Sequence, residues 1–234
     1  MDPYRKLALY YDRIYHGKDY RTESASIAQL IRRHTHGKEL LDVGCGTGQH
    51  LVHLRKQFRC TGVDASAAML AVARKKVKGA RFHKGDMRTF SLRKKFDALV
   101  CLFSGIGYLR SDRELVQAFR NFLRHLRPGG VCLVEPWLSP GVFQAGRPHM
   151  VTYDNADLKM ARLNVSERKK DLSVLDMHHL IAERRTRVRY LRSRHELRMV
   201  GTPKLLQLMR RAGLRARFLR RGLTGRGLLV GTKP

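Results

Sequence analysis

The segment LLDVGCGTGQH, residues 40–50, constrains the fold more than any other part of the chain. Two leucines lead into Asp42, and glycines follow at Gly44, Gly46 and Gly48. A glycine-rich turn directly after a buried strand brings the backbone close to a ligand. Several classes of ligand are bound by turns of this kind, so the flanking residues have to decide between them.

Helix and strand patterns alternate through the first 135 residues. Apolar runs predict buried strands at 39–43, 60–63, 81–83, 96–103 and 131–135. Helical periodicity covers 22–33, 49–57 and 66–77, and a capping box at Ser111–Glu114 opens a further helix. This βα series predicts an α/β fold with a parallel, doubly wound sheet that binds ligands at the carboxyl ends of its strands.

The pattern changes after Trp137. Residues 150–200 predict three long strands, at 157–166, 172–182 and 185–199, inserted as an antiparallel meander after the fifth strand. In the third, arginines at 185, 187 and 189 alternate with Thr186, Val188 and Tyr190, which predicts a charged face and a packing face. A helix from Pro203 to Gly213 and strands at 214–220 and 227–231 complete the chain.

The residues around the glycine turn narrow the choice of ligand. A triphosphate-binding loop needs Gly-Lys-Ser/Thr, whereas Gln49 and His50 follow Gly48. A dinucleotide fingerprint spaces its glycines as G-x-G-x-x-G, whereas here the third glycine comes one residue early. Asp42 precedes the turn, where a carboxylate can meet the amino group of a cofactor that carries an amino acid. These features favour S-adenosylmethionine.

Two further acids follow later strands. Asp64 ends the second strand, the position of an acid that accepts both ribose hydroxyls. Asp86, in HKGDM, follows the third strand and is placed to accept from an adenine amine, with the Met87 backbone near the ring. The ribose, adenine and amino-acid parts of S-adenosylmethionine thus each have a candidate partner, whereas no residue is left to bind the second nucleotide of a dinucleotide.

In this order and spacing, LLDVGCGTG, TGVD, KGDM, FDALVC and LRPGG resemble the class I S-adenosylmethionine-dependent methyltransferases. The resemblance implies one Rossmann-like domain over 1–234, with a seven-stranded, mostly parallel sheet. Within it we expect N-terminal lid helices at 1–36, a cofactor-binding core at 37–140, the meander at 147–200 and the final helix and strands at 201–234. It implies cofactor contacts from the following residues: Tyr11, Tyr20, Asp42, Gly44, Cys45, Gly46, Asp64, Ala65, Met69, Gly85, Asp86, Met87, Leu102 and Phe103.

At a finer level the chain is similar to the nucleotide-sugar N,N-dimethyltransferases of the desosamine and mycaminose type. The similarity rests on YYDRIY, GKDY, LFSGIGYL, PGGVCLVEPW and GRGLLVG, and it weakens at 147–200. It implies a lid that includes Tyr11, Tyr15 and Tyr20. It also implies an acceptor site in which Arg226 meets a diphosphate, with lining residues Ser104, Gly105, Tyr108 and Trp137.

No motif identifies a catalytic nucleophile. The segment after the fourth strand lacks Asp/Asn-Pro-Pro-Tyr/Phe, and no proline precedes Cys101, which argues against the two usual kinds of nucleobase methylation. Tyr108 and Tyr15 are candidates to orient or deprotonate an amine. His178 and His179 lie on a predicted strand that points one ring inward, so His179 is a third candidate.

The net charge of +29 leaves the acceptor open. A small-molecule amine, which can carry an anionic group such as a diphosphate, is the first hypothesis, and an RNA or ribosomal substrate is the alternative that the charge favours. A cofactor-binding protein without turnover and O-methylation of other metabolites also remain. Four cysteines without CxxC spacing predict reduced thiols and no metal site. Without a signal-peptide or membrane-spanning pattern, we expect a cytoplasmic protein, and a homodimer is compatible with the sequence.

Overall fold

The computed structural model describes residue 2 and residues 4–234. Its larger sheet has seven strands in the order β10-β11-β5-β4-β1-β2-β3. Strands β1 to β5 are parallel to one another, and β11 is antiparallel to both β5 and β10. The strands are β1 Glu39–Val43, β2 Arg59–Asp64, β3 Arg81–Lys84, β4 Phe96–Cys101, β5 Leu126–Val134, β10 Arg215–Leu219 and β11 Leu228–Thr232. The predicted α/β fold with a seven-stranded, mostly parallel sheet is confirmed.

Helices cover both faces of this sheet. One face packs against α2 (Tyr20–Arg32), α3 (Gln49–Leu54) and α4 (Ala67–Lys76), and the other against α5 (Asp112–His125) and α6 (Thr202–Arg211). As predicted, the hydroxyl of Ser111 caps the amide of Glu114 at the start of α5. Because helices cover both faces, β1 and β4 are buried along their whole length.

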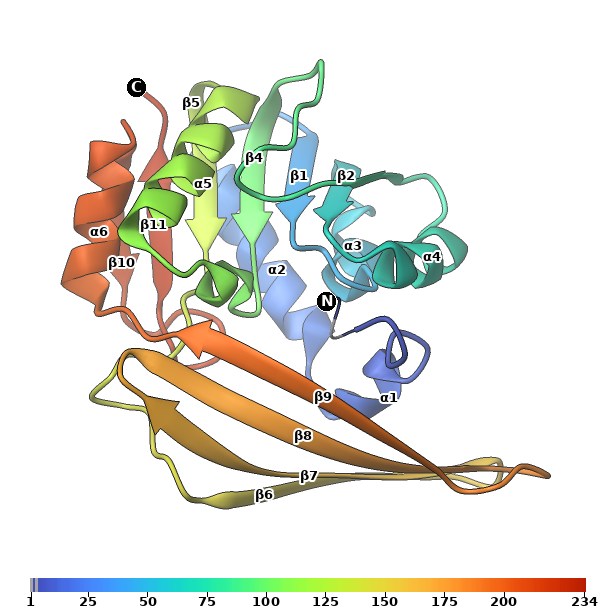
Figure 1. The fold of residues 1–234 in the computed structure, drawn as a ribbon. Helices are drawn as coiled ribbons and strands as arrows, with labels where there is room; N and C mark the ends of the chain where they lie inside the picture. The colour runs from blue at the N-terminus through green and yellow to red at the C-terminus, as the bar shows by residue number, and fades with distance from the viewer. Residues whose placement is uncertain (1, 3) are drawn as a thin grey trace.

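The insertion after β5 is a second, antiparallel sheet of four strands, not three. It runs in the order β6-β7-β8-β9, with β6 Pro148–Asp154, β7 Leu158–Lys169, β8 Leu172–Glu183 and β9 Arg189–Arg198. The sequence analysis missed β6 because this edge strand is largely exposed and lacks a clear alternation. Figure 1 shows this sheet lying beneath the carboxyl ends of β1, β4 and β5.

The face assignment in the third predicted strand was wrong. Arg185 adopts a positive φ of 62° in the turn before β9, so the strand begins only at Arg189. Val188 and Tyr190, expected to pack, are exposed. The buried side chains of β9 are Ser193, His195 and Leu197, which have the opposite parity. The turn resets the alternation, and side chains of period two then follow the new register.

The N-terminal region divides into two parts with different roles. Helix α2 was expected to belong to a lid, yet Ile27 and Ile31 are fully buried in the core of the larger sheet. The segment before it, with the single-turn helix α1 (Tyr11–Ile14), lies between the two sheets (Figure 1). The covering segment is therefore the stretch up to Tyr15. No helix among the described residues is long and apolar enough to cross a membrane.

Candidate active site

A cavity of about 450 Å³ opens at the carboxyl ends of β1, β2 and β4. The residues that line it come from the glycine turn, the ends of β2 to β4 and the N-terminal segment. They are Asp2, Tyr4, Tyr11, Val43, Gly44, Gly46, Asp64, Ala65, Ser66, Met69, Gly85, Met87, Leu102, Phe103, Gly105 and Tyr108. Most residues expected to meet the cofactor therefore lie around one space.

The glycine turn forms one wall of this cavity. Gly44, Gly46 and Gly48 have φ values of +74°, +54° and +76°, a conformation that residues with a side chain rarely adopt. A Cβ atom on Gly44 would meet nothing within 4 Å among the described atoms, so its missing side chain leaves space beside the backbone. Cys45 does not line the cavity; it is buried below the turn, against Gly62.

Asp64 is held in place by the backbone of its neighbours. The amides of Gly46 and Ser66 donate to its two carboxylate oxygens, with N···O distances of 2.7 and 2.8 Å. Burial nevertheless raises its pKa, and the Asp2 carboxylate adds to the effect. The side chain is thus fixed in one orientation at the edge of the cavity, which suits an acceptor for ribose hydroxyls.

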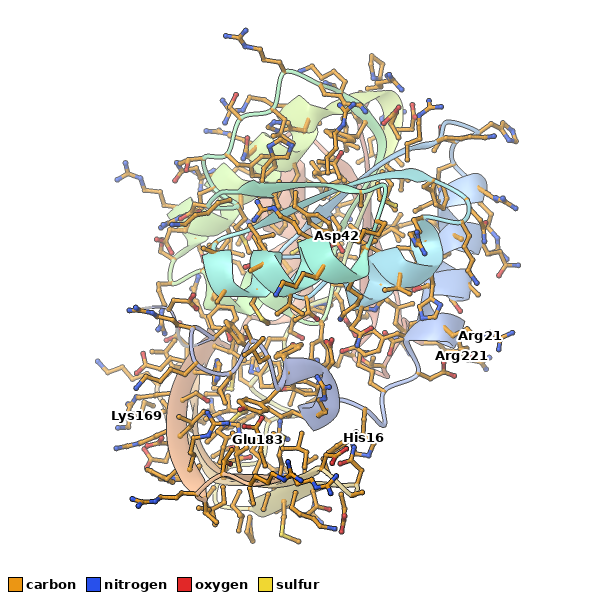
Figure 2. The ribbon with its side chains drawn as sticks, turned by 90° about the vertical axis from the view of Figure 1, so that its right-hand side faces the viewer. His16, Arg21, Asp42, Lys169, Glu183 and Arg221 are labelled. Atoms are coloured by element: carbon orange, nitrogen blue, oxygen red, sulfur yellow. The ribbon has the colours of Figure 1, made fainter. Side chains whose placement is uncertain are left out.

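Asp42 belongs to β1 of the larger sheet (Figure 2); it is almost fully buried and does not line the cavity. No hydrogen bond to its carboxyl group is found among the described residues. Burial, together with the nearby Asp64 carboxylate, raises the pKa of Asp42 to about 8. A cation placed beside this pair of acids would relieve the cost of ionising both.

Asp86 is arranged differently from its expected role. Both of its oxygens accept from the guanidinium of Arg88, which also pairs with Glu114. The Arg88 guanidinium holds the pKa of Asp86 below its usual range. Gly85 and Met87 on either side line the cavity, whereas Asp86 does not. The sequence predicted an acid at this turn correctly. It could not show that an arginine two residues later would engage both of its carboxylate oxygens.

The N-terminal segment closes the cavity through polar contacts to the core. The Ser66 hydroxyl donates to Asp2 at 2.6 Å, and the Thr47 hydroxyl donates to Asp12 at 2.6 Å. Of the three tyrosines assigned to the lid, Tyr11 lines this cavity and Tyr15 lines its neighbour. Tyr20 lines neither and packs edge-on against His50 at 4.9 Å between ring centroids.

A second cavity, of about 470 Å³, lies between the N-terminal segment, the turn after β4 and the inner face of the four-stranded sheet. Four residues line both cavities and form their shared wall: Tyr4, Tyr11, Phe103 and Tyr108. Ser104, Trp137 and Arg226, expected at an acceptor, line the second cavity, and Gly105 lines the first. Tyr4 was missed because it stands outside the YYDRIY motif.

The turn between the cavities is strained. Phe103 and Ser104 follow one another with positive φ values of 50° and 65° although neither is glycine. The fully buried carboxylate of Glu135 accepts from the Phe103 amide at 2.7 Å and from the Thr224 hydroxyl. Ser104 in turn donates to the carbonyl of Pro136 at 3.0 Å. The end of β5 thus holds the wall through which the two cavities meet.

Tyr108 connects this wall to the four-stranded sheet. Its hydroxyl lies 2.7 Å from Nδ1 of His195 and also contacts the Tyr4 hydroxyl. Burial and the Arg162 guanidinium lower the pKa of His195 to about 4, so the ring is neutral near pH 7. The sequence analysis missed His195 because it assigned the wrong face of β9. It chose His179, which is buried but does not line the cavity and bonds Ser193 at 3.3 Å.

The second cavity is lined by basic side chains and by no acidic ones among the described residues. Arg147, Arg162 and Arg226 contribute to it, and Arg226 stacks on Trp137 at 5.0 Å from the ring centroid. No group of three or more histidine, cysteine or acidic side chains is arranged to hold a metal ion in the part of the chain that the structure describes. The site therefore combines a cofactor-sized cavity with an adjoining cationic cavity.

Comparison with known proteins assigns this arrangement to a family. Residues 40–130 match a methyltransferase domain family. The chain is 40% identical over 225 residues to dTDP-3-amino-3,4,6-trideoxy-alpha-D-glucopyranose N,N-dimethyltransferase of Streptomyces venezuelae, covering 94% of this chain and 95% of the relative. The chain belongs to the sugar N-methyltransferases of class I. It is an S-adenosylmethionine-dependent methyltransferase, and S-adenosylmethionine is its cofactor.

Other relatives agree over the whole length of this methyltransferase. A dTDP-3-amino-3,6-dideoxy-alpha-D-glucopyranose N,N-dimethyltransferase of Streptomyces fradiae is 37% identical, covering 97% of this chain and 90% of the relative. The crystal structure of Streptomyces venezuelae DesVI matches with a TM-score of 0.90 and 38% identity, covering 97% and 96% of the two chains. Calicheamicin-pathway CalS10 of Micromonospora echinaspora, an amino pentose methyltransferase solved with S-adenosylmethionine, matches with a TM-score of 0.84 and 34% identity, covering 94% and 93%.

Proposed function

We propose that this methyltransferase transfers methyl groups to the amino group of a nucleotide-linked amino sugar. The observation that carries the proposal is the second cavity, which adjoins the cofactor cavity through a shared aromatic wall and is lined by three arginines and by no described carboxylate. An acceptor that carries a diphosphate suits such a cavity. The relatives named above act on dTDP-linked amino sugars, which supports the same class of acceptor here.

The glycine turn and Asp64 would hold the cofactor, and the Asp42–Asp64 pair favours a positive charge beside it. When bound, S-adenosylmethionine supplies a methyl group activated by its sulfonium, and in-line attack by a neutral amine leaves the nitrogen as an ammonium and the sulfur as a thioether. The chain's contribution is to position the amine, because the methyl group needs no further activation.

The cationic cavity favours the neutral form of the acceptor amine. No described carboxylate lines it, so nothing stabilises an ammonium there, and the nearby guanidinium groups disfavour one. Burial raises the pKa values of the Tyr4, Tyr11 and Tyr108 phenols, which therefore stay neutral. In our proposal Tyr108 accepts a hydrogen bond from the amine and orients it, while its own contact with Nδ1 of the neutral His195 ring fixes the direction of the hydroxyl. Tyr15 packs edge-on against Phe103 at 5.0 Å and confines the amine.

Ser104, Trp137 and Arg226 would shape the opposite side of the acceptor site. Arg226 donates to the Ser104 hydroxyl at 2.7 Å and lies over the Trp137 ring, so its guanidinium stays in the cavity. We do not propose His179 as a catalytic base, because it does not line the cavity. A cytoplasmic location fits an enzyme that uses S-adenosylmethionine and a nucleotide sugar.

The RNA alternative is not favoured. The relatives that match nearly the whole chain are amino-sugar methyltransferases, and the match includes the arginine-rich strand predicted at 185–199. The remaining basic charge is spread over the exterior.

Methyl transfer from labelled S-adenosylmethionine to a panel of acceptors tests the proposal. The panel holds dTDP-amino sugars, the same amino sugars without the nucleotide, unrelated amines and total RNA. Label is expected in the nucleotide sugars, at far lower acceptor concentration than in the free amino sugars. Label in RNA alone, or equal use of the free sugars, would overturn the assignment of the acceptor.

A further inference from the structure

The covering segment, over residues 4–15, makes different kinds of contact on its two sides. Toward the four-stranded sheet the contacts are apolar: Leu7, Tyr10 and Ile14 are buried and form one cluster with side chains of β7 and β8. Toward the larger sheet, no described residue of the segment belongs to either of the hydrophobic clusters of the core. The segment is therefore packed on the four-stranded sheet and is only attached to the larger one.

Apart from ring contacts of Tyr4 and Tyr15 with the turn after β4, this attachment is polar and centres on Asp12. One carboxylate oxygen of Asp12 accepts from the Thr47 hydroxyl at 2.6 Å, and the other pairs with the ammonium of Lys76 at the end of α4. Thr47 belongs to the glycine turn, and Asp12 lines neither cavity. One side chain thus joins the covering segment to the wall of the cofactor cavity without reaching the space itself.

The two sides of the segment differ in how readily they separate. The side chains of Asp12 and Lys76 are 21% and 24% exposed, so water can replace both partners when they part. The contact between Asp2 and Ser66, just before the segment, is also polar, and Asp2 is exposed. Separation from the four-stranded sheet would instead expose a buried apolar cluster to water, which nothing offsets. The cofactor cavity should therefore open at Asp12 and not at the sheet.

The four-stranded sheet is anchored to the rest of the chain at the other end of its strands. There Nε1 of Trp137 donates to the Ser173 hydroxyl at 2.7 Å, and Arg198 pairs with Asp112 at 3.0 Å. The apolar cluster with the covering segment includes Leu158, at the opposite end of the sheet, where β7 begins. Figure 1 shows α1 between this half of the sheet and the larger sheet. We expect the segment and this half of the sheet to move together.

We propose that Asp12 holds the covering segment closed over the cofactor, and that its parting from Thr47 and Lys76 is the step that admits and releases S-adenosylmethionine. In this step the segment stays packed on the four-stranded sheet. Asp12 is a positioning residue, because it acts on the cofactor through the segment and the glycine turn and not by contact. The inference goes beyond the proposed function, since it concerns the cofactor alone and holds for any acceptor.

A closing contact has a kinetic signature that a cofactor-binding contact lacks. Loss of a residue that touches the cofactor speeds dissociation and leaves association nearly unchanged, so Kd weakens by the same factor as dissociation quickens. Loss of a closing contact lowers the population of the closed form both with and without the cofactor. Both rate constants then rise, and Kd changes less than either of them. The two rate constants together therefore distinguish these roles.

Rapid filtration with labelled S-adenosylmethionine measures both rate constants, since binding gives association and a chase with excess unlabelled cofactor gives dissociation. The variants are Asp12→Ala, Thr47→Val, Thr47→Ser, Lys76→Met, Tyr10→Phe and Glu167→Gln. Glu167→Gln is the control, because Glu167 forms an exposed ion pair with Lys169 at the end of β7 away from the segment. Tyr10→Phe tests the other side of the segment, because it removes the hydroxyl contacts to Glu183 and Arg189 of the four-stranded sheet.

Asp12→Ala and Thr47→Val are each expected to raise both rate constants at least about fivefold, while Kd stays within about threefold of wild type. Thr47→Ser keeps the hydroxyl donor and should stay close to wild type. Added salt should speed dissociation in wild type and have little effect in Asp12→Ala and Lys76→Met, because it screens the partly exposed ion pair. Glu167→Gln and Tyr10→Phe should stay within about twofold of wild type in both rate constants.

Wild-type rate constants in folded Asp12→Ala and Thr47→Val would overturn the proposal. Faster dissociation with unchanged association would also overturn it, because Asp12 would then belong to cofactor binding itself. If Tyr10→Phe speeds exchange as much as Asp12→Ala does, the opening lies at the four-stranded sheet and the proposal fails. Circular dichroism verifies folding, and if Asp12→Ala does not fold, Thr47→Val and Lys76→Met decide the question. No acceptor is present in these measurements, so a failure of the proposed function leaves their result unchanged.

Discussion

Asp64 is the side chain in the cofactor cavity whose orientation is best defined by its own backbone contacts. Because two amides fix both oxygens, it would meet the ribose hydroxyls that we propose it binds without further ordering. We expect Asp64→Ala to weaken S-adenosylmethionine binding by more than about tenfold, since charge-assisted hydrogen bonds are lost. Calorimetry measures this, with the exposed Asp157→Ala as control. Unchanged affinity in Asp64→Ala would remove Asp64 from the cofactor site.

Asp42 gives this site a pH dependence. Its pKa of about 8 in the free protein lies above its ordinary value near 3.8, so the folded protein binds an extra proton between these limits. The stability of the free protein should therefore fall as pH rises from about 4 to about 8. A bound cation favours the carboxylate, so S-adenosylmethionine should bind more tightly as pH approaches 8 and release protons.

Calorimetry of wild type and Asp42→Asn in two buffers of different ionisation enthalpy, at pH 6.5, measures this proton release. It should be clearly smaller in Asp42→Asn, because the group that binds the extra proton is then absent. Equal release in both proteins would mean that Asp42 does not titrate on binding.

For single residues, the sequence predicts those whose place in the site follows from their position next to a strand or in a turn. The position of Asp64 at the cavity can be predicted because it ends a strand, and that of the glycines because they form the turn after one. His195 does not, because its exposure to the cavity depends on where β9 begins, and the turn at Arg185 reverses the parity. The role of Asp86 likewise could not be predicted, because it depends on the side chain of Arg88, whose direction does not follow from a sequence pattern.

Among the elements, the turn after β4 holds two successive non-glycine residues with positive φ, which strains its backbone. Glu135 accepts from the Phe103 amide, so Glu135→Ala leaves that amide unpaired and the two positive-φ residues unsupported. We expect a loss of about 2–3 kcal/mol in the free energy of unfolding, measured by urea denaturation. Glu135→Gln keeps an accepting oxygen and should lose less. A Glu135→Ala protein as stable as Glu135→Gln would show that the carboxyl group does not support the turn.

The two sheets also differ in how much of them could be predicted. The central strands of the larger sheet are buried on both faces, and the predicted bounds of β1 to β4 lie within two residues of the observed ones. Strand β5 instead begins at Leu126, five residues before its predicted start. The four-stranded sheet is buried on one face only, and β6 is an exposed edge. Its number of strands is set by pairing across turns, which a single sequence indicates only weakly.

At the scale of the whole molecule, the outer face of the four-stranded sheet exposes several large apolar side chains between its charged ones. Met150 and Leu163 are paired there across β6 and β7, and Leu180 and Tyr190 across β8 and β9, and all four are exposed. Strands of up to 12 residues in four rows give this face roughly 750 Å². A stable interface buries about 800 Å² on each partner, so a second copy of the chain would cover it.

We therefore expect a homodimer that pairs these outer faces. The protein carries a net charge of +29, which opposes self-association, but the face compensates its own arginines through the Arg192–Asp176 and Arg194–Glu196 pairs. Sedimentation should give about twice 27.0 kDa for wild type. Leu163→Lys combined with Leu180→Lys should give the monomer while S-adenosylmethionine still binds. Leu9→Lys changes an equally exposed leucine outside this face and should stay dimeric. A monomeric wild type, or a dimeric double variant, would contradict this interface.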